Sequence, residues 1–282
     1  MFKARAIVTE RRAHAGTIAG LLRVSTLLRG CASLAAAFAS VASASADDWL
    51  LPRVSAHAEA ARYAPAEREL GWTTWIGASA GLVRARGATL YGAAELETIV
   101  GDERRAFDAN QANYHLEVGV SARRGTFELT PFFHHVSRHV VDRPKLQAVD
   151  WNVLGVRLER QVEGNVALRL TLGAGHTTLA SFVGYGWELT ARAEGEWPRQ
   201  RRAAGYAIAA ARAVTVTGKR APELSPDGFV DLLVEAGGRF RRQARSLSLF
   251  AAFERRHDVF VDRPGQRDRG LIGFRFSFAD TE

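Results

Sequence analysis

The feature that most constrains this chain is a period-two alternation of apolar and polar residues, repeated in many short segments. In "VDLLVEAGGRF", for example, Val230, Leu232 and Val234 share one face, whereas Asp231 and Glu235 share the other. Successive side chains of a strand point to opposite faces, so each such segment predicts a strand with one apolar face. Twelve segments are of this kind: 52–63, 72–84, 88–100, 113–123, 126–138, 151–162, 165–176, 185–196, 204–216, 228–241, 246–257 and 269–278. The faces of 204–216 cannot be assigned, because its alternation is poor.

The connections between these segments alternate between short and long. "ARG", "RRG", "EG" and "RQAR" are tight turns, whereas "GDERRAFDANQA", "HVVDRPKLQAVD", "GKRAPELSPD" and "DVFVDRPGQRD" are long and polar. Short turns at one end and long loops at the other are typical of outer-membrane barrels. The pattern predicts an all-β fold, an antiparallel up-and-down transmembrane β-barrel of about twelve strands. Both termini then lie at the short-turn, periplasmic end, and 101–112 and 139–150 are expected to be the largest loops.

A soluble barrel or sandwich is the structural alternative, with the apolar faces turned inward. The aromatic residues favour the membrane, because six tryptophans lie at or near segment ends, where interfacial girdles occur: Trp49, Trp72, Trp75, Trp151, Trp187 and Trp197. The last segment, "GLIGFRFSF", carries Phe274, Phe276 and Phe278 on one face. It resembles the closing strand of bacterial outer-membrane proteins, which their assembly machinery recognises, although four residues, "ADTE", follow here.

Residues 1–46 differ from the rest of the chain. They are basic, run into the apolar "CASLAAAFASVASASA" and end in Ala44-Ser45-Ala46 before Asp47. This pattern predicts a signal peptide (1–46) ahead of a single barrel domain (47–282) in the outer membrane of a Gram-negative bacterium. Removing it lowers the formal charge from +8 to +3, since six basic residues and one acidic residue lie in it. The only cysteine, Cys31, leaves too, so we expect no disulfide, and nucleic acid binding loses its main support.

The polar face of the segments carries glutamate and arginine in mixed order. Twelve strands enclose a narrow interior, between the filled eight-stranded and the open sixteen-stranded barrels. We therefore expect a charged, largely filled lumen held by ion pairs, and a narrow polar pore is the alternative. No long apolar run suggests a transmembrane helix after the leader. We expect a monomer without metal or cofactor, whose partners are outer-membrane lipid, lipopolysaccharide and the barrel assembly machinery.

Two stretches of the chain resemble each other. "FFHHVSRHVVDRP" and "AFERRHDVFVDRP" both pass from an aromatic strand to Val-Asp-Arg-Pro, which pairs Phe133 with Phe253, Asp142 with Asp262 and Pro144 with Pro264. The segments that follow pair Gly155 with Gly273 and Arg157 with Arg275. The likeness indicates either a duplicated half-barrel or two hairpins with the same structural needs. The repeated Asp-Arg-Pro is interpreted as a turn.

His135-Val136-Ser137 is the part of this stretch that does not repeat. Residues two apart on a strand share a face, so the imidazole can reach the hydroxyl and take its proton. The parity of the segment places His135, Ser137 and His139 on the lipid face, although a bulge at Pro131 would turn them into the lumen. Asn152, on the next segment, shares this face and is the candidate third member, with Asp150 as the alternative.

The arrangement resembles outer-membrane phospholipase A and the barrel lipid A deacylases, which carry His-x-Ser at the outer end of a strand. The resemblance implies acyl-ester hydrolysis of outer-leaflet lipid by Ser137, His135 and Asn152. It covers about 20 residues, and the chain departs from the pattern in having Arg138 after the serine and a longer interval to Asn152. The His-x-Ser-x-His spacing is also similar to that of barrel families without an established activity. A polar belt at the membrane surface is the simpler interpretation of these histidines.

Three functions remain open at this stage. The first is a non-enzymatic barrel, structural or a narrow channel, the second is the lipid acyl hydrolase, and the third is surface binding through the long loops.

Overall fold

The computed structural model describes residues 49–141, 148–198, 202–218, 227–257 and 265–279. Every regular element is a β-strand, twelve in all, and no described helix is long and apolar enough to cross a membrane. The strands are β1 (Trp49–Ala64), β2 (Trp72–Ala85), β3 (Ala88–Gly101), β4 (Asp108–Arg124), β5 (Phe127–Val140), β6 (Val149–Val162), β7 (Ala167–Ala180), β8 (Tyr185–Trp197), β9 (Ala203–Val216), β10 (Phe229–Arg242), β11 (Arg245–Arg256) and β12 (Arg267–Ala279).

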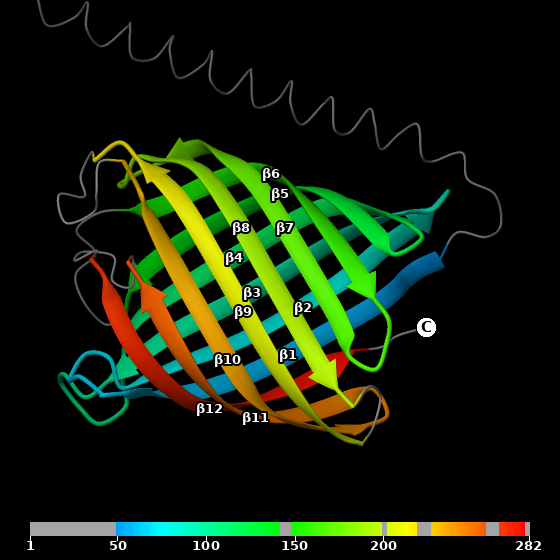
Figure 1. Cartoon of the computed structure of the whole chain (residues 1–282). Coiled ribbons are helices and arrows are strands. Elements are labelled where there is room, and N and C mark those ends of the chain that lie inside the picture. Colours follow the sequence, from blue (N-terminus) through cyan, green and yellow to red (C-terminus); the bar gives the residue numbers. More distant parts are fainter. Residues whose placement is uncertain (1–48, 142–147, 199–201, 219–226, 258–264, 280–282) are drawn as a thin grey trace, which may run out of the picture. The chain divides into compact units, whose positions relative to one another are not determined.

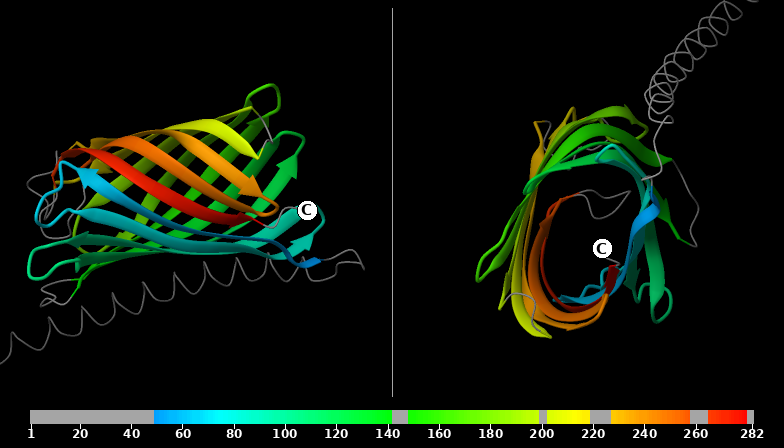
Figure 2. Two further views of the ribbon diagram at one scale, coloured as in Figure 1. Left: turned by 90° about the horizontal axis from the view of Figure 1, so that it is seen from below. Right: turned by 90° about the vertical axis from the view of Figure 1, so that its right-hand side faces the viewer.

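The strands form one closed barrel in which every neighbour in the chain is also a neighbour in space. β12 pairs antiparallel with β1, from Ser55 opposite Ala279 to Ala64 opposite Gly270, and this pairing removes the last sheet edge. Figure 1 shows the tilted strands, and the right-hand view of Figure 2 looks along the barrel from its short-turn end. Closure leaves no sheet edge with unpaired backbone N–H and C=O groups. A sheet can span the hydrocarbon of a bilayer only when these groups are paired. The predicted fold is therefore confirmed, including the strand count.

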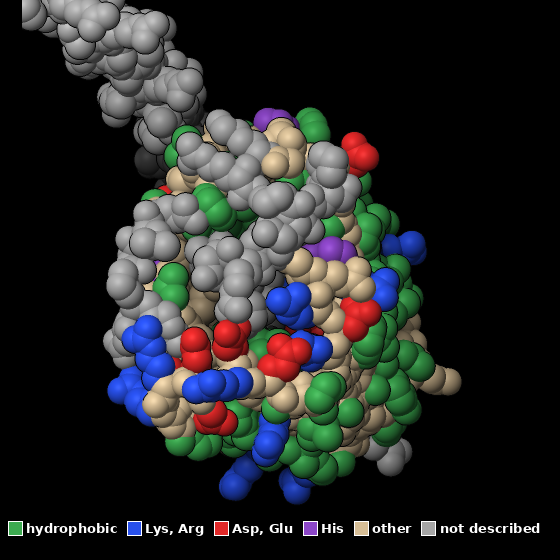
Figure 3. Space-filling model, turned by 90° about the vertical axis from the view of Figure 1, so that its left-hand side faces the viewer, with side chains coloured by type: hydrophobic (Ala, Val, Ile, Leu, Met, Phe, Trp, Pro, Cys, Tyr) green, Lys and Arg blue, Asp and Glu red, His purple; other side chains and the backbone are tan. Residues whose placement is uncertain are grey.

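The outer wall of the barrel is apolar. Exposed residues alternate along the strands, as in Leu154, Val156 and Leu158 of β6, which are 55%, 42% and 40% exposed. Figure 3 shows hydrophobic side chains along this wall and charged side chains gathered at the end of the barrel that faces the viewer. β9 could not be assigned from sequence because its outward positions are alanine or glycine except for Thr215, and most of its inward positions are apolar as well.

The tryptophans divide between the two faces. Trp187 and Trp197, at opposite ends of β8, are 56% and 46% exposed on the outer wall. Trp75 and Trp151 instead face the lumen, opposite the inward residues Glu97 and Val136, so their assignment to an outer girdle is wrong. Their parity within the strand, and not their nearness to a strand end, decides where they point. The side chain of Trp49 lies outside the described residues.

The prediction that 101–112 and 139–150 are the largest loops is also wrong, and the second of them is only 141–148. The connection expected at 101–112 is only 102–107, because β4 begins at Asp108 and pairs with the end of β3. The first residues of β4 are polar and therefore do not look like a strand, but their side chains are buried inside the barrel: Asp108, Asn110, Gln111 and Asn113. The longest connections between strands are 217–228 and 257–266. Asp142, Pro144, Asp262 and Pro264 of the predicted turns lie outside the described residues.

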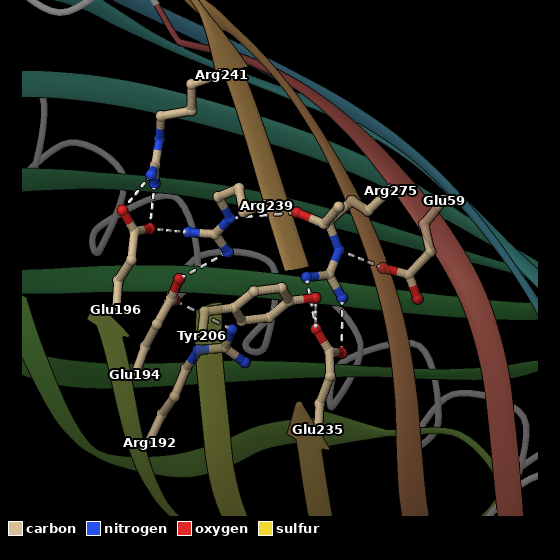
Figure 4. Close-up of polar contacts among 10 residues, drawn as sticks. Glu59, Arg192, Glu194, Glu196, Tyr206, Glu235, Arg239, Arg241 and Arg275 are labelled. Atoms are coloured by element: carbon tan, nitrogen blue, oxygen red, sulfur yellow. Dashed lines mark hydrogen bonds and ion pairs between the residues drawn. The ribbon is translucent and has the colours of Figure 1, made fainter. Parts of the chain in front are cut away.

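The lumen is filled by ion pairs that join strands across the barrel. Arg275 of β12 donates to both oxygens of Glu235 on β10 at 3.0 and 2.9 Å and also contacts Glu59 of β1. Figure 4 shows this network on one side of the lumen, formed by Glu59, Arg192, Glu194, Glu196, Tyr206, Glu235, Arg239, Arg241 and Arg275. Charges removed from water in this way are stable only when they are paired and hydrogen-bonded, as they are here.

Apolar side chains fill the lumen near the long-loop end as well. One cluster of buried residues lies there around Trp151, Tyr185 and Phe229, and a second extends from Tyr63 and Ile99 at that end further into the barrel. Leu70, from the β1–β2 connection, is fully buried in the second cluster. A charged lumen was predicted, but these apolar clusters were not, because inward apolar residues look like irregularities in the alternation.

The two halves of the barrel share one structural module. On β3 to β6, Glu117 accepts hydrogen bonds from Tyr91 (2.7 Å) and from Arg157 (2.8 and 3.0 Å), and Arg157 lies 4.9 Å over the ring of Phe132. Tyr91 lies opposite Gly119, and Phe132 lies opposite Gly155. A side chain at either glycine would collide with the ring beside it.

The same contacts recur on β9 to β12, on the opposite wall. Glu235 accepts from Tyr206 (2.7 Å) and from Arg275, which lies 5.1 Å over the ring of Phe250. Gly237 lies opposite Tyr206, and Gly273 lies opposite Phe250. The equivalent positions on β4 to β6 and β10 to β12 are 118 residues apart.

This register corrects part of the sequence alignment. Gly155 with Gly273 and Arg157 with Arg275 are equivalent, but the equivalent of Phe250 is Phe132, so the pairing of Phe133 with Phe253 is wrong. The repeat therefore covers a three-dimensional module of side chains from four strands, which favours a duplicated half-barrel over two similar hairpins.

The module makes a prediction about stability. Arg275→Met should lower the free energy of unfolding by about 3–5 kcal/mol, because it leaves the carboxylates of Glu235 and Glu59 inside the lumen without their cation. Arg255→Met, which removes an ion pair of half-exposed side chains with Asp268, should cost less than about 1 kcal/mol. Denaturant unfolding in lipid vesicles measures both values, and equal losses would contradict a stabilising lumen network.

Candidate functional site

The candidate site lies on the outer wall, at the long-loop end of β5 and β6. Ser137 is ten residues from Phe127 on the same face of β5. At about 3.3 Å per residue and a tilt of about 40°, this separation corresponds to about 25 Å along the barrel axis, the height of the apolar band of an outer-membrane barrel. An apolar band that begins at Phe127 would therefore end near Ser137, and we expect the side chains around Ser137 to lie where lipid headgroups meet the hydrocarbon.

The strand parity holds through the whole of β5. Pro131 lies opposite Val156, and the β5–β6 register continues without a shift to Ser137 opposite Asp150. On the other side, Ser137 lies opposite the exposed Tyr114. His135, Ser137 and His139 thus face outward, and Pro131 causes no bulge that would turn them into the lumen.

His135 and Asn152 are brought together as a hydrogen-bonded pair. They lie directly opposite each other on β5 and β6, and His135 Nδ1 is 2.7 Å from Asn152 Oδ1. An amide oxygen can only accept, so this bond places the proton on Nδ1 and leaves Nε2 as the basic nitrogen of the ring. Third groups that hold a catalytic imidazole have this role.

Ser137 bonds to the other neighbouring imidazole. Its Oγ lies 2.9 Å from Nε2 of His139, two residues further along the same face. The ring of His139 packs edge-on against the ring of Tyr114, with centroids 5.4 Å apart. The hydroxyl is therefore flanked by two imidazoles, of which His139 contacts it and His135 is held by Asn152.

A second polar contact borders the site on β6 and the β7–β8 connection. Asp150, opposite Ser137, accepts a hydrogen bond from Ser181 Oγ. The β6–β7 register shifts between Asn152 and Val153, and Thr178 Oγ1 donates to the carbonyl of Asn152 at 3.3 Å. Such bulges redirect neighbouring side chains and often lie beside functional sites.

The opposite wall provides a comparison site in the same chain. The residues 118 positions on from Ser137 and Asp150 are Arg255 and Asp268, which also face each other across a strand pair. They form a two-bond ion pair at 3.0 and 3.1 Å. Phe253 and Gly270 stand where the first wall has His135 and Asn152. The hydroxyl, imidazole and amide thus occur together on one wall only.

Sequence reasoning found Ser137, His135 and Asn152 and their common face, but it missed the bond from Ser137 to His139. The same two-residue spacing lies on either side of the serine in His-x-Ser-x-His, and spacing alone cannot decide which imidazole the hydroxyl meets. Among the residues that the structure describes, no group of three or more His, Cys, Asp or Glu side chains is arranged to hold a metal ion.

The sequence matches no family model and no curated protein. Several solved structures resemble the fold. The NanC porin matches with a TM-score of 0.51 and 8% identity over 79% of this chain and 98% of its own. Outer membrane phospholipase A from Escherichia coli matches with a TM-score of 0.50 and 9% identity, over 80% of this chain and 92% of its own. LpxR from Salmonella typhimurium matches with a TM-score of 0.48 and 9% identity, over 79% of this chain and 99% of its own.

Identities this low show the fold alone. The resemblance agrees with the closed barrel. The chain is a twelve-stranded β-barrel of the bacterial outer-membrane type.

The position of the site can be tested with single cysteines, because Cys31 is the only cysteine of the chain and lies in the predicted leader. Ser137→Cys should react with a membrane-impermeant maleimide on intact cells, since it lies at the outer edge of the apolar band. Leu129→Cys, on the same face of β5 but deeper in the band, should not react. Equal labelling of the two, measured by mass shift, would contradict this placement.

Proposed function

We propose that the protein is an outer-membrane acyl-ester hydrolase that acts on outer-leaflet lipid. The observation that carries the proposal is the 2.7 Å bond between His135 and Asn152 beside an outward-facing Ser137. Nucleophile, base and orienting amide are the three parts of a serine hydrolase site. The outer membrane phospholipase among the similar folds supports the architecture and not the assignment of these residues.

The chemistry follows from the three side chains. Ser137 Oγ attacks the ester carbonyl carbon while Nε2 of His135 takes its proton, and the imidazolium returns that proton to the departing alcohol. Water then attacks the acyl carbon while His135 takes its proton, the acyl–Oγ bond breaks, and the imidazolium returns the proton to Ser137 Oγ as the fatty acid leaves. Asn152 holds the ring through Nδ1 during both steps. One staggered step about the Cα–Cβ bond of Ser137 changes the imidazole toward which Oγ points.

The position of the site determines the class of substrate. A lipid ester lies just below the headgroup, at the depth that Ser137 occupies on the wall. The neighbouring outward residues Leu154 and Leu116 are 55% and 51% exposed and provide an apolar surface for acyl chains. A lipid therefore reaches the serine by lateral diffusion, without entering the filled lumen.

The hydrolase makes a kinetic prediction. Purified protein in mixed micelles should release fatty acid from phospholipid or lipid A, and Ser137→Ala should reduce the rate to background. Asn152→Ala should reduce kcat by about 10²-fold or more, because the ring loses its orientation. Asp268→Asn, at the comparison site, should leave the rate unchanged. Absence of release by wild-type protein, or equal release by Ser137→Ala, would contradict the proposal.

Two histidine variants assign the base. His135→Gln should abolish turnover, whereas His139→Gln should retain it, since Ser137 can then turn to His135. The reverse result would move the base to His139, which contacts Ser137 in the structure.

A narrow channel is the second candidate function, and the cavities of the lumen favour it. A cavity of about 480 Å³ around His115, His134 and Trp75 lies near one of about 620 Å³, with Trp75 and Glu254 lining both. Arg169 lines the latter and two further cavities, of about 890 and 900 Å³. The four cavities form a series along the lumen, lined by charged and apolar side chains together.

The channel can be tested by conductance. Wild-type protein in planar bilayers should show small or no single-channel currents, and Glu235→Ala with Arg275→Ala should increase them because both side chains line the cavity of about 620 Å³ and their removal widens it. An unchanged current in a folded double variant would contradict a lumen limited by this pair.

Several predictions accompany the proposal. The leader at 1–46 lies outside the described residues, and export through it to the outer membrane stays a prediction. Recognition by the assembly machinery, contact with lipopolysaccharide, the monomeric state and surface binding by the loops are also predictions.

A further inference from the structure

Charged side chains on the outer wall gather at the short-turn end of β4 to β6. Arg124 lies opposite Phe127, and Phe127 lies opposite Arg160, so three adjacent strands present these side chains in one outward row. All three are exposed, and the guanidinium of Arg160 lies 5.2 Å over the ring of Phe127. The row lies about 25 Å below Ser137 along the axis, at the inner edge of the apolar band.

The opposite wall carries a second row of the same composition. Arg242 lies opposite Arg245, and Arg245 lies opposite Phe278, on β10, β11 and β12. Each of these positions is 118 residues after the equivalent position of the first row. From strand to strand, the second row reads Arg-Arg-Phe, whereas the first reads Arg-Phe-Arg. Both rows thus contain two guanidinium groups and one exposed ring.

These arginines differ from those of the lumen in their partners. Within the described part of the chain, none of Arg124, Arg160, Arg242 and Arg245 forms an ion pair with a carboxylate. Arg255, outward at the other end of the wall, is paired with Asp268. Like charges directly opposite each other on neighbouring strands are destabilising, so an anion bound between Arg242 and Arg245 would relieve their repulsion.

The membrane supplies an anion at this depth. Phosphate groups of the inner leaflet lie at the lower edge of the apolar band, and guanidinium groups bind phosphate through paired hydrogen bonds. The ring in each row provides an apolar surface beside the acyl chains, as aromatic residues do at membrane interfaces. Two guanidinium groups carry two positive charges, whereas a zwitterionic headgroup has no net charge to neutralise them. The rows therefore favour an anionic lipid.

We propose that the two rows are binding sites for the phosphate of an anionic phospholipid of the inner leaflet, one on each side of the barrel. The sites are separate from the proposed hydrolase site and do not depend on it. They would fix the depth of the barrel at its periplasmic edge through two opposite contacts.

Native mass spectrometry of the full barrel tests the proposal, with phosphatidylglycerol, phosphatidylcholine and inorganic phosphate as probes. Wild-type protein should retain up to two phosphatidylglycerol molecules through delipidation and at least tenfold less phosphatidylcholine. Arg124→Gln with Arg160→Gln should lose one, Arg242→Gln with Arg245→Gln should lose the other, and the fourfold variant should lose both. Arg255→Gln is the matched control and should retain both.

Two lipid-retention results would overturn the proposal, and a competition result would do so as well. One is equal phosphatidylglycerol retention by wild-type protein and the fourfold variant. The other is equal retention of phosphatidylglycerol and phosphatidylcholine by wild-type protein. Displacement of the lipid by millimolar inorganic phosphate would assign the rows to phosphate alone and contradict a lipid site. Replacing the four arginines by lysine keeps the charge, so retention by that variant supports the charge argument even if the glutamine variants fold poorly.

Discussion

Satisfaction of the backbone hydrogen bonds is the constraint on which the structure depends. Lipid offers no partner for an unpaired N–H or C=O group, so the sheet must close, and the pairing of β12 with β1 closes it. Closure then forces every second side chain into a narrow interior. The glutamates and arginines there are compatible with burial because opposite charges from nearby strands are paired, as Arg275, Glu235 and Glu59 illustrate.

The outer wall has three levels with different chemistry. An apolar band separates a polar row at Ser137 from the arginine rows that include Arg160 and Arg242. Because strand parity is continuous along β5, the same alternation that directs its inward side chains into the lumen also sets which side chains face the two edges of the apolar band. The proposed hydrolase site and the proposed lipid-binding rows thus lie at opposite edges of the same outer wall. Neither needs an opening through the wall.

The strand pattern could be predicted from sequence because period-two alternation and loop asymmetry are properties of single segments. What failed depends on contacts between segments. Trp75 and Trp151 point inward because of their parity, β4 begins early because polar residues such as Asn110 are buried in the lumen, and Phe132 replaces Phe133 in the repeat because strand pairing sets the register. At the candidate site, the common face of His135, Ser137 and Asn152 was predictable, whereas the choice of His139 by Ser137 depends on rotamers that the sequence does not contain.

The equivalence of the two walls has a consequence for chain connectivity. In the repeat, the gap between Ala279 and Trp49 corresponds to the short turn between β6 and β7, and both gaps lie at the same end of the barrel. The order of the strands around the ring would therefore be the same if β7 to β12 preceded β1 to β6 in the chain. A circularly permuted barrel would keep every strand pairing of the native one. The architecture therefore depends on the cyclic order of the strands and not on which strand comes first in the chain.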